Sequence, residues 1–138
     1  MSSSPATLIL QRCRAFVGGD FGLVWDIHHP DSFFRGLYPD REAYLEFAGT
    51  SLQADFTIRE CRILQEESGE SAARVIYYLD IQFKGERRES FELCWLRRLD
   101  DGQWRYLATQ KIERQEFHGE MDEIGWEDFE RAEDKVIF

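Results

Sequence analysis

The sequence predicts a single α+β domain in which three N-terminal helices pack on a curved antiparallel sheet of about four strands. Apolar residues recur at helical spacing over roughly the first 50 residues, and they alternate with the strand period of two from about residue 56. The 138 residues suit one domain, and a hydrophobic content of 43% is enough for a core. Helices followed by strands are typical of the α+β class.

The predicted helices are bounded by residues that cap or end helical backbone. Ser4 is a good N-cap and Pro5 suits the first helical position, so the first helix should begin there. Glycine adopts the left-handed conformation that ends helices, which places the end at Gly18-Gly19. Similar reasoning predicts a second, short helix from Asp20 to before Pro30, a loop over Asp31–Pro39, and a third helix from Asp40 to about Gly49.

Four strands are predicted over residues 56–66, 73–83, 89–99 and 104–112. The odd-numbered residues of the second strand are apolar from Ala73 to Phe83 and should face the helices. Phe91, Leu93 and Trp95 are expected to face the helices from the third strand. Asp80 and Glu92 are then expected to point away, together with an outer apolar patch of Ile76, Tyr78, Cys94 and Leu96.

The charge of the chain is concentrated near its C-terminal end. The net charge is −10, and residues 115–138 hold nine acidic and two basic residues. We therefore predict a domain over residues 5–114 and an acidic C-terminal appendage, a helix or tail, over residues 115–138. Acidic surfaces repel phosphates, so neither nucleic acid nor an anionic membrane is an expected partner. Its apolar residues Trp126, Phe129, Ile137 and Phe138 favour docking of the appendage on a partner, on the other subunit or on its own domain. The alternative is a frayed acidic end that aids solubility.

The cysteines and the N-terminal sequence predict a soluble, cytoplasmic protein. Cys13, Cys61 and Cys94 are odd in number and widely spaced, which argues against a disulfide framework and favours a reducing compartment. The apolar runs are too short for a signal peptide or a membrane span. No cofactor is expected.

The segment Arg12–Phe21, followed by His29-Pro30, resembles the opening of the NTF2-like domain in YchJ-type, SEC-C-associated proteins. The Asp101–Trp104 hairpin resembles the last strands of that family, and the resemblance covers about residues 8–113. It implies an NTF2-like cone with a cavity between the sheet and the helices. The cysteine-rich SEC-C zinc motif is missing, since the chain has no Cys-x-Cys and no Cys-His pair, so no zinc site is carried over.

NTF2-like domains include isomerases, dehydratases, epoxide hydrolases, ligand carriers and dimerisation modules, so the fold does not select a function. His28 and His29 are candidate acid–base groups near the expected cavity, with Tyr77 as a hydrogen-bond donor. The alternative for His29 is a structural hydrogen bond at the end of the second helix. Two adjacent histidines rarely converge on one metal, and His118 lies in the tail, so no metal site is expected.

Aromatic residues are the candidate lining of a ligand pocket, with a filled core as the alternative. Arg12 either pairs with a buried carboxylate or a ligand anion, or lies at the surface with its stem on the core. The candidate ligand-binding residues are Trp25, Tyr44, Phe47, Tyr77, Trp95 and Trp104.

The sequence favours a non-enzymatic module that forms a homodimer through the outer apolar patch and binds a small apolar ligand. Periodicity places no carboxylate inside the cone, where NTF2-like isomerases carry their catalytic base. The alternative is a small isomerase, dehydratase or hydrolase that uses His28 or His29 in the cone cavity. A third hypothesis is an adaptor that binds a protein partner through the acidic appendage.

Overall fold

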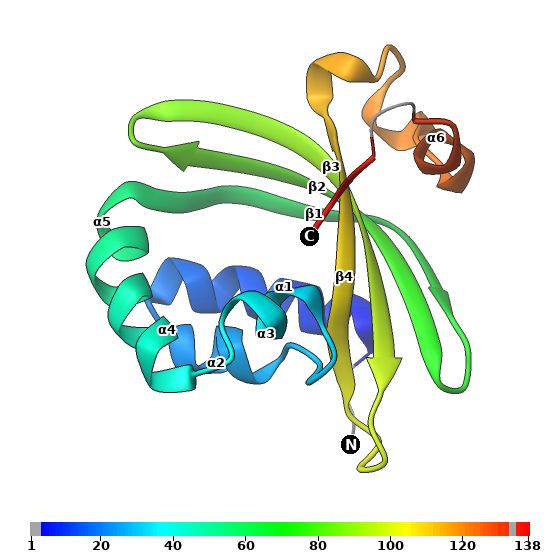
Figure 1. Ribbon diagram of the computed structural model, residues 1–138. Helices are drawn as coiled ribbons and strands as arrows, with labels where there is room; N and C mark the ends of the chain where they lie inside the picture. Colours follow the sequence, from blue (N-terminus) through cyan, green and yellow to red (C-terminus); the bar gives the residue numbers. More distant parts are fainter. Residues whose placement is uncertain (1–3, 133–134) are drawn as a thin grey trace.

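A five-stranded antiparallel sheet with the strand order β1-β2-β3-β4-β5 curls around a layer of helices (Figure 1). The computed structural model describes residues 4–132 and 135–138. This architecture confirms the α+β class and adds a short fifth strand to the four that were predicted. The strands are Phe56–Ser68 (β1), Ala72–Phe83 (β2), Glu86–Arg98 (β3), Trp104–Glu113 (β4) and Val136–Ile137 (β5).

The caps predicted from the sequence begin three of the helices. The hydroxyl of Ser4 accepts a hydrogen bond from the Thr7 amide over 3.1 Å. Gly19, in the left-handed conformation at φ 75°, follows the last residue of the first helix. The side chains of Asp20 and Asp40 accept amide hydrogen bonds in the same way. These helices are Pro5–Gly18 (α1), Phe21–Asp26 (α2) and Arg41–Phe47 (α4).

The segments before and after α4 are more helical than predicted. The expected loop over residues 31–39 contains a short helix, Phe33–Leu37 (α3), because the hydroxyl of Ser32 caps it by accepting from the Arg35 amide. Gly49 does not end the third predicted helix, since a π-helical turn, Ala48–Leu52, and Gln53–Asp55 (α5) continue it as far as β1. In the described part of the chain, no helix is both long enough and apolar enough to cross a membrane.

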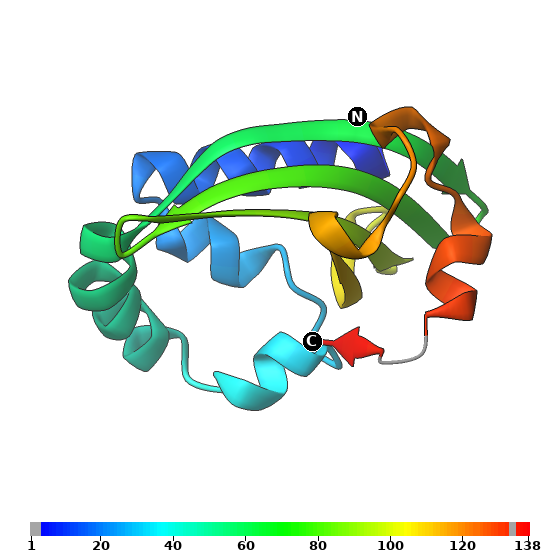
Figure 2. The ribbon, with the colours of Figure 1, turned by 90° about the horizontal axis from the view of Figure 1, so that it is seen from above.

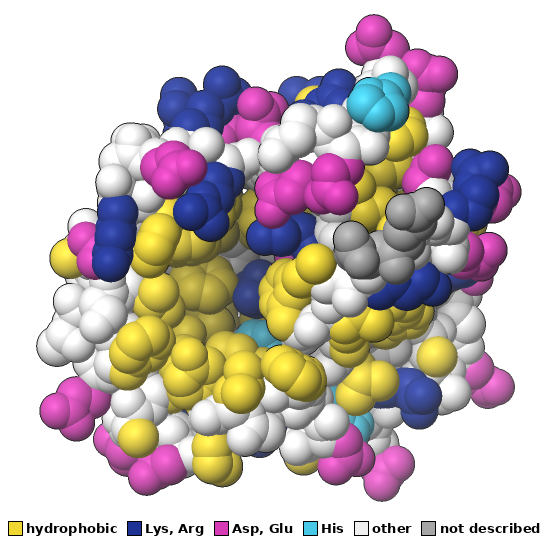
Figure 3. Space-filling view, turned by 45° about the horizontal axis from the view of Figure 1, so that its top comes forward, with side chains coloured by type: hydrophobic (Ala, Val, Ile, Leu, Met, Phe, Trp, Pro, Cys, Tyr) yellow, Lys and Arg dark blue, Asp and Glu magenta, His cyan; other side chains and the backbone are white. Residues whose placement is uncertain are grey.

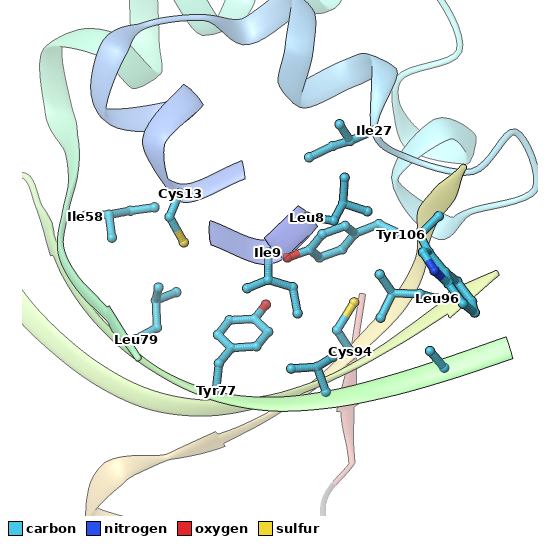
Figure 4. Close-up of a cluster of buried hydrophobic side chains, with 13 residues drawn as sticks. Leu8, Ile9, Cys13, Ile27, Ile58, Tyr77, Leu79, Cys94, Leu96 and Tyr106 are labelled. Atoms are coloured by element: carbon cyan, nitrogen blue, oxygen red, sulfur yellow. The ribbon is translucent and has the colours of Figure 1, made fainter. Parts of the chain in front are cut away.

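The concave face of the sheet forms the main core against α1. Figure 4 shows Ile9 and Cys13 of α1 directed toward the sheet, where Tyr77 and Cys94 lie, and Leu8 beside Tyr106 and Ile27. The predicted facing of β2 is confirmed, since Ala73, Val75, Tyr77 and Leu79 all belong to this cluster and Ile81 packs against it. Figure 2 shows α1 lying along β1 and β2.

The predicted facing of β3 is wrong by one residue. Tyr77 pairs with Glu92 and Val75 pairs with Cys94, so Glu92, Cys94 and Leu96 share the concave face. Phe91 and Leu93 lie on the opposite face, with Trp95 packed against them. The cause is that β3 is covered on both sides. Its two faces are therefore both apolar, and period-two alternation does not distinguish them.

The C-terminal segment covers the convex face of the sheet. Ile124 and Phe129 of this segment pack with Ile76 and Tyr78, and Phe129 belongs to a short helix, Trp126–Arg131 (α6), seen on the far side of the sheet from α1 (Figure 1). The side-chain amide Nε2 of Gln110 donates a hydrogen bond to the Phe129 carbonyl over 2.8 Å. The predicted outer apolar patch is therefore not exposed. Ile76 and Tyr78 are covered by the C-terminal segment, and Cys94 and Leu96 lie on the concave face. Two acids of the predicted appendage, Glu133 and Asp134, lie outside the described residues.

Candidate functional site

A hollow opens beside β4, where α3 and the C-terminal strand come together. Figure 3 shows an opening with hydrophobic walls, inside which basic and histidine side chains are visible. The enclosed part has a volume of about 60 Å³. Strand β5 pairs with β4 and brings Phe138 to the opening, next to α3 (Figures 1 and 2). The side chains that matter chemically are apolar Phe33, Phe34, Leu37 and Phe138, and polar Arg12, His28 and Tyr106.

Arg12 projects from α1 into this hollow. Its guanidinium lies over the rings of Phe16 and Tyr106, at 4.9 Å from each ring centre, which favours the cation. Burial acts to lower the pKa of Arg12, but the oxygens of Tyr106, Tyr77 and Glu92 outweigh it and the pKa lies above its ordinary value. Arg12 is therefore charged. Its Nε is shut off from solvent and has no hydrogen-bond partner among the described residues.

Two tyrosine hydroxyls share this lack of partners. Tyr106 and Tyr44 are each only 2% exposed, and no described residue hydrogen-bonds to either hydroxyl. Burial raises the pKa of Tyr44 to about 12, and it also raises the pKa of Tyr106, so both groups are protonated donors at neutral pH. Tyr44 packs edge-on against Phe34 with ring centres 5.0 Å apart, and Phe34 lines the hollow.

Glu92 is an inward-facing carboxylate that the sequence reasoning missed. The Tyr77 hydroxyl donates to its Oε1 over 3.2 Å, and both side chains are buried. Burial raises the pKa of Glu92, although the charge of Arg12 and the Tyr77 hydrogen bond oppose this effect. The signal was the Lys84-Gly85 turn, in which both residues have positive φ. A two-residue hairpin at that place pairs residue 77 with residue 92.

The two histidines have different surroundings and do not converge. The ring of His28 lines the hollow and stacks on Phe34, with ring centres 3.8 Å apart. Its Nδ1–H donates to the Val24 carbonyl over 2.7 Å, which leaves Nε2 as an acceptor. Burial, followed by the charge of Arg12, lowers the pKa of His28 to about 3. His28 is therefore neutral at physiological pH.

His29 lies outside the hollow, at the end of the segment that follows α2. Its amide donates to the Tyr106 carbonyl over 2.7 Å, and its Nδ1 accepts from the Asp31 amide over 2.9 Å. These are the contacts of a residue that fixes a turn. Within the described ranges, no group of three His, Cys, Asp or Glu side chains converges in a way that would hold a metal ion.

The six aromatic residues proposed as ligand-binding are dispersed. Trp25 stacks under the Arg35 guanidinium at 3.5 Å, and Phe47 stacks on Tyr38. Trp104 and Tyr77 belong to the concave core, whereas Trp95 packs with the convex cluster. The hollow takes its aromatic wall from Phe33, Phe34 and Phe138 instead. The concentration of aromatic residues in the segment after Pro30 was the available signal.

Comparison with known proteins supports the fold. No protein-family model matches the chain, and no curated protein matches it in sequence. The fold is similar to the solution structure of a SEC-C motif containing protein from Rhodopseudomonas palustris. The TM-score is 0.62 at 18% sequence identity, over 79% of this chain and 79% of that one. At this identity the likeness establishes a shared α+β fold with a SEC-C motif protein.

Proposed function

We propose that this protein is a non-catalytic, NTF2-like ligand-binding module that holds a small organic molecule in the hollow beside β4. The observation that carries the proposal is a pair of buried polar atoms, Arg12 Nε and Tyr106 Oη, on two residues that line the hollow; neither atom has a hydrogen-bond partner among the described residues. Nearly all buried polar groups of folded proteins have a partner, and leaving one unpaired costs about 1–3 kcal/mol. A bound molecule with hydrogen-bonding groups would supply the missing partners.

The dimensions of the hollow support a ligand with a small polar head and an apolar body. The enclosed volume of about 60 Å³ is on the order of two water molecules, so it admits a head group. At the opening, Phe33 is 51% exposed, Leu37 61% and Phe138 39%. Large apolar side chains that cluster at an opening favour contact with an apolar partner. The rest of the ligand would lie against them.

A small enzyme is the second candidate, and Glu92 is the observation that favours it. A buried carboxylate with a raised pKa and a Tyr77 donor resembles the acid–base groups of cavity enzymes. His28 suits that role less, because a pKa of about 3 makes it a weak base. In this case Glu92→Gln would abolish any turnover found, while the variant would still bind ligand.

Homodimerisation, partner binding through residues 115–138 and a cytoplasmic location stay predictions. So does the division into a domain over residues 5–114 and an appendage. The patch that motivated the dimer no longer supports it, because Ile76 and Tyr78 pack against Ile124 and Phe129 of the same chain. The mass of the intact protein in solution tests the dimer.

Native mass spectrometry of freshly purified protein, beside a denatured sample, tests the ligand-binding proposal. A retained molecule, released on denaturation, is the expected result. Leu37→Ser should then weaken rebinding of that molecule about five- to tenfold, since it removes about 1 kcal/mol of apolar contact at the opening. Leu23→Ser, at an exposed leucine of α2 away from the hollow, is the matched control and should bind normally. Equal effects of the two substitutions would contradict this location of the site.

A further inference from the structure

We propose that the ligand of the hollow is a small carboxylic acid whose carboxylate pairs with the guanidinium of Arg12 and whose apolar part lies against Phe33, Phe34 and Phe138. This inference rests on the proposed function and specifies the chemical class of its ligand. Arginine recognises carboxylates through two parallel hydrogen bonds, a geometry that a single point charge does not provide.

The charge of Arg12 is not neutralised by a contact within the chain. No carboxylate of residues 4–132 or 135–138 makes an ion pair or hydrogen bond with it, and no acidic side chain lines the hollow. Glu92 is close enough to interact electrostatically, but its Oε1 is taken by the Tyr77 hydroxyl and burial favours its protonated form. A shielded cation without a counter-ion is unfavourable in a folded protein. An anion brought by a ligand would remove that cost.

The remaining features of the hollow favour a monovalent carboxylate over a phosphate. Among the described residues that line the hollow, Arg12 has the one charged side chain, and a phosphate dianion would require further cations or several amide donors. The ring of Tyr106 lies beneath the Arg12 guanidinium, and its hydroxyl, a neutral donor without a partner among the described residues, suits one carboxylate oxygen. The apolar walls suit the hydrocarbon part of an organic acid.

The net charge of −10 does not prevent such binding. Interactions between exposed charges are screened beyond about 8 Å at physiological ionic strength, whereas Arg12 acts at contact distance in a poorly hydrated site. The acidic surface would slow the approach of an anion, and the local pair would decide the equilibrium.

Matched acids and amides test this proposal by isothermal titration calorimetry at pH 7.5. The probes are hexanoate with hexanamide, and benzoate with benzamide, because each pair shares its apolar part and sets an anionic carboxylate against a neutral amide of similar size. We expect the acid of at least one pair to bind at least tenfold more tightly than its amide. Arg12→Gln should remove that preference and leave amide binding unchanged. Arg14→Gln, at an exposed arginine of the same helix, is the control and should keep the preference.

Each other outcome is decisive. If an acid and its amide bind equally well, the carboxylate assignment is overturned and the ligand-binding proposal stands. Binding of inorganic phosphate that is lost in Arg12→Gln, with no preference for the acids, also overturns the assignment. If none of the four compounds binds, and native mass spectrometry shows no retained molecule, both proposals fail. Circular dichroism confirms that the variants are folded, and Tyr106→Phe, which should weaken acid binding severalfold, provides a second variant.

Discussion

The hydroxyl of Tyr77 donates a hydrogen bond to Oε1 of Glu92 over 3.2 Å, across directly paired positions of β2 and β3. Both side chains lie in the concave core, where a carboxylate without a donor is poorly accommodated. The hollow has the opposite arrangement, since the hydroxyl of Tyr106 is equally buried and has no partner within the described part of the chain. One tyrosine thus completes a polar pair within the chain, whereas the hydroxyl of the other is buried and unpaired among the described residues.

Removal of the two hydroxyls should therefore have different effects. Tyr77→Phe leaves a buried acceptor unpaired, so we expect it to lower the free energy of unfolding by about 1–3 kcal/mol. Tyr106→Phe removes a hydroxyl that has no partner among the described residues, so the free energy of unfolding should change by less than about 0.5 kcal/mol or increase. Urea unfolding at pH 7 measures both. Equal losses would show that Tyr106 has a partner in solution.

The effect of Glu92→Gln on the free energy of unfolding should become more favourable as the pH rises. Burial raises the pKa of folded Glu92 above its ordinary value of 4.5. The folded state then binds more protons than the unfolded state, so this group contributes stability that is lost as the pH rises from about 4.5 through the folded pKa. Glutamine does not titrate. The difference in unfolding free energy, variant minus wild type, should thus be larger at pH 8 than at pH 5, and a constant difference would contradict the shift.

His28 should make the protein sensitive to mild acid. Its pKa falls from 6.5 to about 3 in the folded state because of burial and of the nearby charges of Arg12 and Arg35. The unfolded state therefore binds the extra proton, and the stability present above about pH 6.5 is lost as the pH falls. Between pH 7 and pH 5 this amounts to about 2 kcal/mol for one such group.

The test compares His28→Asn with the wild type by urea unfolding at both pH values. Asparagine keeps a donor near the Val24 carbonyl and does not titrate. The loss of stability from pH 7 to pH 5 should be about 2 kcal/mol smaller in the variant, whatever its absolute stability. His29→Asn is the control and should follow the wild type. A variant with the same loss as the wild type would exclude His28 as the cause.

Local signals predicted the helix ends and the main strand because each depends on neighbours in sequence. Ser4, Gly19 and Asp20 act within one turn of their helices, and the Ala73–Phe83 alternation reflects one buried face. The facing of β3 depends instead on the C-terminal segment, which lies far away in sequence and covers the second face. The period-two alternation within β3 does not reveal that a distant segment packs against its second face.

The site depends even more on tertiary contacts. The sequence makes Arg12 a candidate for binding an anion, but its position in a hollow depends on the meeting of α1 with Tyr106 of β4 and Phe138 of the last segment. The alternation in β3 places Glu92 on the wrong face for the same reason as its neighbours. Aromatic residues at core spacing, such as Trp104, were core residues, which composition does not distinguish from pocket residues.

Cys13 and Cys61 form a thiol pair between α1 and β1 that oxidation should link. The neighbouring Cys61 thiol lowers the pKa of Cys13, and both residues line one surface depression. We expect diamide, which accepts two hydrogens per disulfide formed, to join them within the chain. Peptide mapping should find Cys13 bound to Cys61 and Cys94 still free, since burial raises the pKa of Cys94. Linkage of Cys94 to either residue would contradict the arrangement.

The contact between Phe129 and the convex face of the sheet should stabilise the whole domain. Phe129 is fully buried against this face, so Phe129→Ala should cost about 3–5 kcal/mol, whereas Ile137→Ala, at an exposed position of β5, should cost under about 1 kcal/mol. Removal of residues 117–138 would uncover Ile76 and Tyr78 together, and apolar patches of this kind drive association.

Sedimentation equilibrium then separates docking on the chain itself from docking on a partner. If the segment packs on the sheet of its own chain, the truncated chain should self-associate or unfold, while the intact chain stays monomeric. If the segment instead binds a partner, truncation should leave both the stability and the mass per particle of the body unchanged. A dimer of the intact chain that survives Phe129→Ala would require a different interface, because the convex face is already filled by Ile124 and Phe129.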